Sequence, residues 1–271
     1  MKQRRGLEHL MIELLAVIFM GTLLSKGCLL LPNFKDIESK KSIVDLEFLF
    51  TGRKVQFIPI IGNCLNVLRK DGQSKVKYVL NIILELVGSI SITVLFYQYG
   101  IAFDFFFKTL WVLIFLTLAS TDLNSRKLPN YILIPLIVVL VFMIPFWNMV
   151  GYERYMFGYN QILGSIINTG LISVGLSLFW IGIYYAYPGS IGGGDIKLII
   201  IVGLFFGFSG ALITMYISII TAAVFSIIKM ILTKQIRSVF IPFGSVISLA
   251  AILVITAEAK LLQIYQFVVV D

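Results

Sequence analysis

The sequence predicts an all-α polytopic integral membrane protein with about eight transmembrane helices. Of its 271 residues, 59% are hydrophobic and only 13% are charged, whereas ordinary soluble domains are about one quarter charged. Beyond residue 77, apolar stretches follow one another with only short polar breaks. Because one span needs ~20 apolar residues, the chain has room for roughly eight spans, and its composition excludes a water-soluble enzyme.

The expected helices follow from the apolar stretches in chain order. These stretches cover residues 10–31, 78–99, 101–121, 131–150, 161–186, 196–208, 210–232 and 241–262. Glu13 and Lys26 interrupt the first stretch, and the stretch at 196–208 is short for a full span. We therefore divide the chain into residues 1–77, with the first helix and a long polar loop, and a polytopic domain at residues 78–271.

Basic residues predict which side of the membrane each turn faces. Lysines and arginines gather in the polar segment 32–77 and in or beside the turns at 122–130, 187–195 and 233–240. Since loops rich in Lys and Arg stay on the cytoplasmic side, we expect all four segments there. We attribute the net charge of +8 to this asymmetry at the lipid bilayer and expect no nucleic-acid partner.

Metal-binding side chains are scarce. The chain has two cysteines, Cys28 and Cys64, and one histidine, His9. These are too few for a disulfide framework or for a zinc site built from Cys and His. We expect no metal ligands, no bound zinc, and two reduced thiols on the cytoplasmic side.

Two aspartates in the apolar half of the chain are the candidate functional residues. Asp122 closes one apolar run, and Asp195 follows three glycines and opens another. On the expected topology both lie at the cytoplasmic boundary, where helices distant in sequence can meet. Two adjacent carboxylates share a proton and titrate as a unit. One can then take a proton from water while the other polarises a carbonyl, which is the chemistry of aspartyl proteolysis.

Each aspartate also has a purely structural interpretation. Asp122 could end a helix and pair with Arg126 or Lys127, both in the turn that follows it. Asp195 could be a helix N-cap, where an acid suits the positive end of the helix dipole. The glycines before it could form only a tight turn after Pro188. The functional interpretation depends on both acids being on one side with few competing acids.

Three motifs resemble those of the prepilin peptidases, which are GxGD-type membrane aspartyl proteases. Residues 192–198, Gly-Gly-Gly-Asp-Ile-Lys-Leu, match that family's GxGDxKL motif. Asp122, followed by Lys-Leu-Pro-Asn at 127–130, resembles the first aspartate and its downstream element. Residues 242–244, Pro-Phe-Gly, resemble an element near the start of the family's last helix.

The resemblance implies a catalytic pair and a substrate class. Asp122 and Asp195 would be catalytic, while Gly192 and Gly194 would let the substrate backbone approach. Lys197 would lie near the pair, either without a chemical role or extended to the lipid headgroups. The substrates would be pilin or pseudopilin precursors of the type IV prepilin kind. The enzyme would sit in the cytoplasmic (inner) membrane and cut the basic leader at the cytoplasmic face.

The segment 1–77 departs from many members of that family. Those members carry two CxxC pairs in the first cytoplasmic loop and methylate the new N-terminus with S-adenosylmethionine. This chain has no CxxC pair, so its loop is degenerate and a tetrathiolate zinc site is excluded. Proteolysis needs no cofactor, and S-adenosylmethionine is a cofactor only if the methyltransferase activity is retained.

Other functions remain open at this point. A presenilin-like or signal-peptide-peptidase-like intramembrane protease also uses GxGD, although it places its first aspartate after a tyrosine, where this chain has Thr121. An ion or solute transporter could use the paired acids as a cation site, since glycine-rich broken helices suit transporters. An inactive relative could survive as a scaffold.

Overall fold

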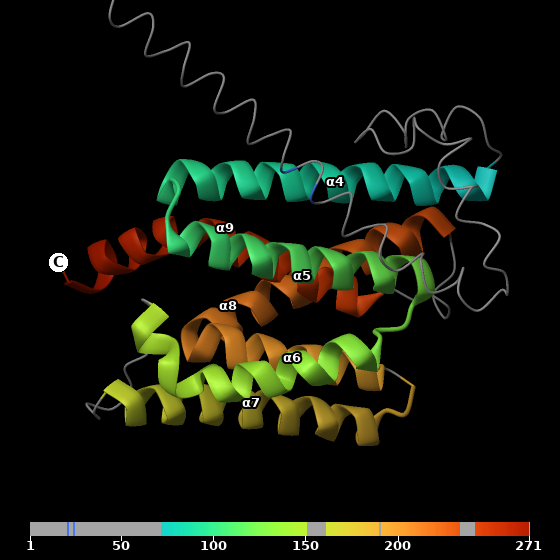
Figure 1. The fold of residues 1–271 in the computed structure, drawn as a ribbon. Helices are drawn as coiled ribbons and strands as arrows, with labels where there is room; N and C mark the ends of the chain where they lie inside the picture. The colour runs from blue at the N-terminus through green and yellow to red at the C-terminus, as the bar shows by residue number, and fades with distance from the viewer. Residues whose placement is uncertain are drawn as a thin grey trace, which may run out of the picture. The chain divides into compact units, whose positions relative to one another are not determined.

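The computed structural model describes residues 21, 24, 72–150, 161–189, 191–233 and 242–270. Within these residues every regular element is a helix, which confirms the all-α fold class (Figure 1). The elements are α4 (Gly72–Tyr99), α5 (Phe103–Ser125), α6 (Asn130–Met143), the 3₁₀ helix η3 (Ile144–Val150), α7 (Gln161–Ala186), α8 (Gly193–Thr233) and α9 (Phe243–Val270).

Five of these helices are long and apolar enough to cross a membrane, so the chain is a polytopic membrane protein. The candidate spans are Val79–Tyr99, Phe103–Ser125, Asn130–Trp147, Leu163–Ala186 and Gly193–Ile231, and Phe243–Ala257 is a shorter apolar helix. The described residues thus carry five candidate spans, and the expected count of eight stays a prediction. The expected first helix at 10–31 lies outside the described residues except for Gly21 and Leu24, and so do His9, Cys28 and Cys64.

The chain divides into two compact units, which are described separately. The first holds residues up to Ser120 and from Ile255 onward, and the second runs from Thr121 to Val254. The division expected after residue 77 stays a prediction, because most of residues 1–77 lie outside the described part.

In the first unit, aromatic and polar contacts close the turn between α4 and α5. The rings of Phe96 and Phe105 meet edge to face with centroids 5.8 Å apart. Lys108 donates a 2.6 Å hydrogen bond to the Tyr99 hydroxyl, and its ammonium also lies 4.2 Å from the centre of that ring. The buried ammonium of Lys108 is therefore both hydrogen bonded and placed against an aromatic ring.

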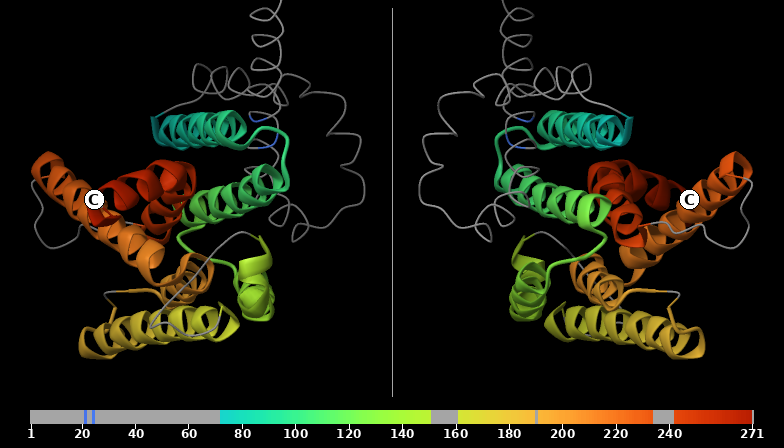
Figure 2. Two further views of the ribbon diagram at one scale, coloured as in Figure 1. Left: turned by 90° about the vertical axis from the view of Figure 1, so that its left-hand side faces the viewer. Right: turned by 90° about the vertical axis from the view of Figure 1, so that its right-hand side faces the viewer.

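In the second unit, α6 and α7 pack against α8 (Figure 2). α7 and α8 approach each other closely at Gly203, where a Cβ atom would lie 2.9 Å from the Ser173 Cα. Small residues allow such close approach between membrane helices, whose association depends on packing rather than on the hydrophobic effect. Trp147 meets Phe205 edge to face with ring centroids 5.8 Å apart, and both side chains are buried.

α8 is broken at Gly207, near the end of the apolar stretch expected at 196–208 and just before the one expected at 210–232. Gly207 has φ 67° and ψ −165°, and Figure 1 shows α8 changing direction along its length. The break frees the backbone N–H of Phe208, which donates a 2.7 Å hydrogen bond to the Asn168 Oδ1 of α7. A buried side chain of α7 thus satisfies a backbone group that no helical bond would satisfy.

We expect Gly207→Ala to lower the free energy of unfolding. The backbone at this position lies in a region open essentially only to glycine, and strain of this kind costs about 1–3 kcal/mol. The matched control is Gly182→Ala in α7, because a Cβ there meets nothing within 4 Å and the glycine has helical backbone angles. Unfolding in detergent micelles measures both variants, and equal stabilities would contradict the strained break.

Candidate active site

Asp122 lies in the last turn of α5, in the second unit. Its carbonyl accepts a 2.8 Å hydrogen bond from the Arg126 N–H, and Arg126 has φ 53°. A left-handed residue directly after a helix is a common way to end it. Although this helix end borders an exposed turn, the Asp122 side chain is only 5% exposed. The turn therefore does not leave Asp122 as a solvated helix end.

Asp195 is the third residue of α8, and Gly192 occupies the N-cap position before it. The Asp195 and Ile196 N–H groups both donate to the Gly192 carbonyl, at 3.0 and 3.4 Å. The Asp195 Oδ2 in turn accepts a 3.2 Å hydrogen bond from the Gly192 N–H. This return bond is half of a capping box. Asp195 therefore contacts the N-cap residue and is not itself the N-cap.

The start of α9 brings the two carboxylates together. The Ser245 N–H donates a 2.7 Å hydrogen bond to the Asp122 Oδ2, and the preceding N–H, on Gly244, donates to the Asp195 carboxylate. A Cβ placed on Gly244 would lie 2.8 Å from the Asp195 Oδ1 and 3.1 Å from the Asp122 Oδ2. One oxygen of each carboxylate is thus within 3.1 Å of the position that a Gly244 Cβ would occupy. This position is at a helix N-terminus, where the helix dipole favours negative charge.

Leu128 provides the apolar side of this arrangement. Its Cδ1 would lie 2.9 Å from a Cβ on Gly244, and its Cβ would lie 3.0 Å from a Cβ on Gly194. The leucine therefore packs against glycines in the first turns of both α8 and α9. In the sequence, Leu128 is recognisable only as an apolar residue between Lys127 and Pro129 in a polar turn.

The three glycines before Asp195 have different surroundings. A Cβ on Gly192 would lie 3.3 Å from the Asp195 Oδ2, and one on Gly194 would press on Leu128. A Cβ on Gly193 would meet nothing within 4 Å. Gly192 and Gly194 are therefore constrained by contacts within the chain, and their role in admitting a substrate backbone stays a prediction.

Lys197 and Asn130 connect the two aspartate motifs. The Lys197 Nζ donates a 2.7 Å hydrogen bond to the Asn130 Oδ1. Asn130 is the first residue of α6, and Lys197 is in the first turns of α8. The resemblance assigned Lys197 no partner, and this bond supplies one.

Sequence reasoning quoted Gly244 only as part of a motif and did not single out Ser245. Their backbone N–H groups contact the aspartates, and no sequence pattern predicts which backbone N–H will do so. Among the residues that the structure describes, no group of three or more His, Cys, Asp or Glu side chains is arranged to hold a metal ion.

The comparisons with known proteins agree with the resemblance. Residues 109–227 match the family model described as the type IV leader peptidase family, and this segment contains both Asp122 and Asp195. No curated protein and no solved structure matches the chain. Over residues 109–227 the chain is therefore similar to the type IV leader peptidase family, and this similarity supports a protease activity.

Proposed function

We propose that the chain is an aspartyl endopeptidase that removes the basic leader from type IV prepilin-like precursors, either pilins or pseudopilins. The observation that carries the proposal is the meeting of the Asp122 and Asp195 carboxylates at the first turn of α9. Both aspartates lie inside the segment that matches the leader peptidase family.

The proposed reaction uses the two carboxylates in complementary states. The ionised carboxylate takes a proton from water, and the oxygen of that water attacks the scissile carbonyl carbon. The protonated carboxyl gives its proton to the carbonyl oxygen, so that a neutral tetrahedral diol forms. As the diol collapses, one of its hydroxyl groups gives its proton back to the ionised carboxylate and becomes the new carbonyl. The C–N bond breaks, and the leaving nitrogen takes a proton from the protonated carboxyl. The pair ends the cycle with one proton, as it began.

Backbone donors orient this pair. The N–H groups of Gly244 and Ser245 are consecutive on α9, and each contacts one carboxylate. A rigid helix therefore sets the position of both acids, with the Gly192 N–H as a further donor to Asp195. Groups preorganised in this way need little rearrangement during the reaction.

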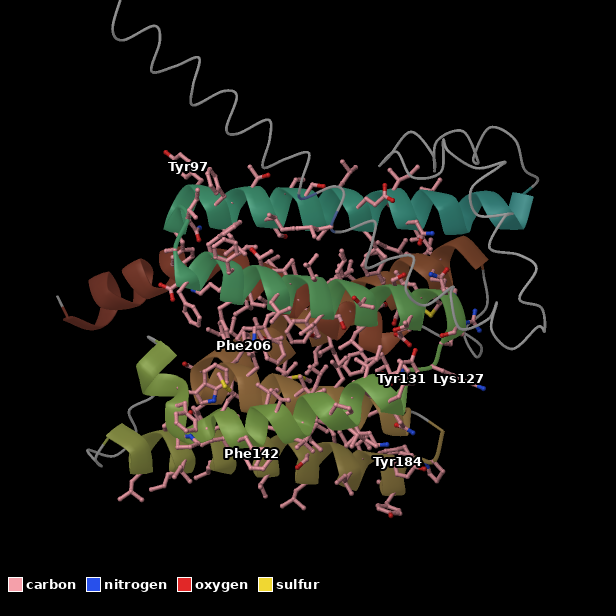
Figure 3. The ribbon with its side chains drawn as sticks, in the orientation of Figure 1. Tyr97, Lys127, Tyr131, Phe142, Tyr184 and Phe206 are labelled. Atoms are coloured by element: carbon pink, nitrogen blue, oxygen red, sulfur yellow. The ribbon has the colours of Figure 1, made fainter. Side chains whose placement is uncertain are left out.

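Residues around the pair support a site at the membrane–water boundary. Tyr131 at the start of α6 and Tyr184 near the end of α7 are exposed and lie at the same end of the second unit (Figure 3). Tyrosine is enriched at the level of lipid headgroups. Arg126 and Lys127 in the adjoining turn are also exposed. The positive-inside rule then favours the cytoplasmic face of the cytoplasmic membrane for the proposed cleavage.

The test is co-expression of the chain with a tagged prepilin-like precursor. We expect loss of the leader and a new N-terminus directly after the basic segment, read by mass spectrometry. The same spectrum reports methylation, as the added mass of one methyl group. If several such precursors keep their leaders although the enzyme is correctly inserted, the proposal is contradicted. Cleavage within a transmembrane segment instead would favour the presenilin-like alternative.

A further inference from the structure

A polar bond joins the two segments that carry the aspartates. Asn130 begins α6, directly after the turn that follows Asp122. Lys197 lies two residues after Asp195, in the first turns of α8. The 2.7 Å hydrogen bond from the Lys197 Nζ to the Asn130 Oδ1 connects side chains that are 67 residues apart in the sequence. It ties the start of α6 directly to the start of α8.

Leu128 makes a second connection between the same segments. It stands two residues before Asn130 and packs against Gly194, which directly precedes Asp195. It also packs against Gly244, whose N–H contacts Asp195. The turn 126–130 is thus held to α8 by an apolar contact and by a hydrogen bond. Because the turn continues directly from the last turn of α5, these contacts bear on the position of Asp122.

The direction of the Lys197 side chain separates it from the carboxylates. Side chains two residues apart on a helix do not face each other, and the Lys197 ammonium is turned to Asn130. This arrangement differs from a lysine that neutralises Asp195, and from one that extends freely to lipid headgroups. The hydrogen bond to Asn130 indicates that Lys197 holds the start of α8 against the start of α6.

We propose that Lys197 and Asn130 are positioning residues, whose hydrogen bond fixes the separation of Asp122 and Asp195. This inference rests on the proposed function, because the separation matters for a reaction that uses both carboxylates. The bond is exposed and adds little to the stability of the fold. Loss of the bond therefore lowers the rate of the reaction, because a displacement of the reacting groups by about 1 Å can reduce that rate roughly 100-fold.

The experiment is a double-mutant cycle on leader cleavage by the purified full chain in lipid nanodiscs. The variants are Lys197→Met, Asn130→Ala and the two combined, with a synthetic precursor peptide as substrate. We expect each single variant to lower kcat about 10-fold, with KM within about twofold. The double variant should be no slower than either single variant, since both remove the same bond.

Two further variants separate this role from general structural damage. Asn130→Asp keeps an oxygen acceptor for the lysine, and we expect it to restore most of the lost kcat. Lys127→Met removes a lysine from the same turn, where the side chain is exposed and extends outward (Figure 3); it should cleave at the wild-type rate. A higher KM in Lys197→Met with no effect of Asn130→Ala would overturn the proposal and assign Lys197 to the substrate. Additive effects in the double variant, or unchanged kcat in both singles, would also overturn it.

A readout without substrate keeps the two proposals distinguishable. Asp122→Cys and Asp195→Cys, combined in a Cys28→Ser and Cys64→Ser background, give one thiol pair at the site. We expect oxidation to cross-link this pair, and Asn130→Ala to slow the cross-linking several-fold. If the wild-type chain cleaves no precursor but the cross-linking depends on Asn130, the proposed function fails and the positioning bond stands. Cross-linking that is equal with and without Asn130→Ala would overturn the positioning role.

Discussion

Asp122→Asn and Asp195→Asn should each reduce leader cleavage by roughly 1,000-fold, which lies within the range attributed to general acid–base catalysis. Asparagine keeps the shape of the side chain and an oxygen that can still accept the backbone hydrogen bonds from Ser245 or Gly192. It cannot, however, exchange a proton with water or with the substrate carbonyl. Single-turnover cleavage of a precursor by purified protein measures the loss.

The matched control for this pair is Asp104→Asn. Asp104 belongs to the same helix as Asp122 but lies in its first turn, whereas Asp122 lies in its last. We expect cleavage close to the wild-type rate in this variant. Insertion and thermal unfolding should match among all three variants. Near-normal cleavage by either of the site variants would show that the reaction does not depend on two carboxylates.

Gly244→Ala should lower kcat by about 100-fold, the loss expected from a displacement of reacting groups by about 1 Å. The added methyl group would lie 2.8 Å from the Asp195 Oδ1, 2.9 Å from the Leu128 Cδ1 and 3.1 Å from the Asp122 Oδ2. Distances below 3.0 Å are essentially never seen for Cβ atoms. One or both carboxylates must move, and the N–H donors of α9 then no longer meet them. Initial rates at saturating precursor measure the effect.

Gly193→Ala is the control for Gly244→Ala. Both glycines lie in the first turn of a helix at this site, but a Cβ on Gly193 meets nothing within 4 Å. We expect this variant to retain most of the wild-type kcat. A Gly193→Ala enzyme as slow as Gly244→Ala would assign the loss to contact with the substrate. An active Gly244→Ala enzyme would mean that the carboxylates tolerate displacement.

The helices were predictable because membrane spans are set by local composition. The expected stretches at 78–99, 101–121 and 161–186 correspond to α4, α5 and α7. The stretch at 131–150 divides instead at Met143, where α6 gives way to the 3₁₀ helix η3. Hydropathy does not distinguish these two helix types. The break in α8 lies at Gly207, just inside the stretch expected at 196–208, because its backbone angles are accessible essentially only to glycine.

The contacts around the aspartates could be anticipated only in part. Few acids in an apolar chain mark Asp122 and Asp195 as candidates, since ionisable groups near a bilayer are costly. Their meeting at the start of α9 depends on how α5, α8 and α9 pack, and the sequence of any one of these helices does not predict that packing. The contribution of Gly244 and Ser245 is made by backbone N–H groups, which every residue except proline carries. The bond between Lys197 and Asn130 likewise joins segments with no shared pattern.

The break at Gly207 has a consequence for synthesis on the ribosome. The part of α8 before the break has roughly 14 residues and a length of about 21 Å, less than the ~30 Å of a bilayer interior. This part cannot be held across the bilayer as a separate segment, so it enters together with the part that follows Gly207. Asp195 therefore reaches its place only after Phe208–Thr233 has emerged, and its backbone donor on Gly244 emerges later still. An unfinished chain carries both acids without the helix that joins them, so under the proposed function the site is complete only late in translation.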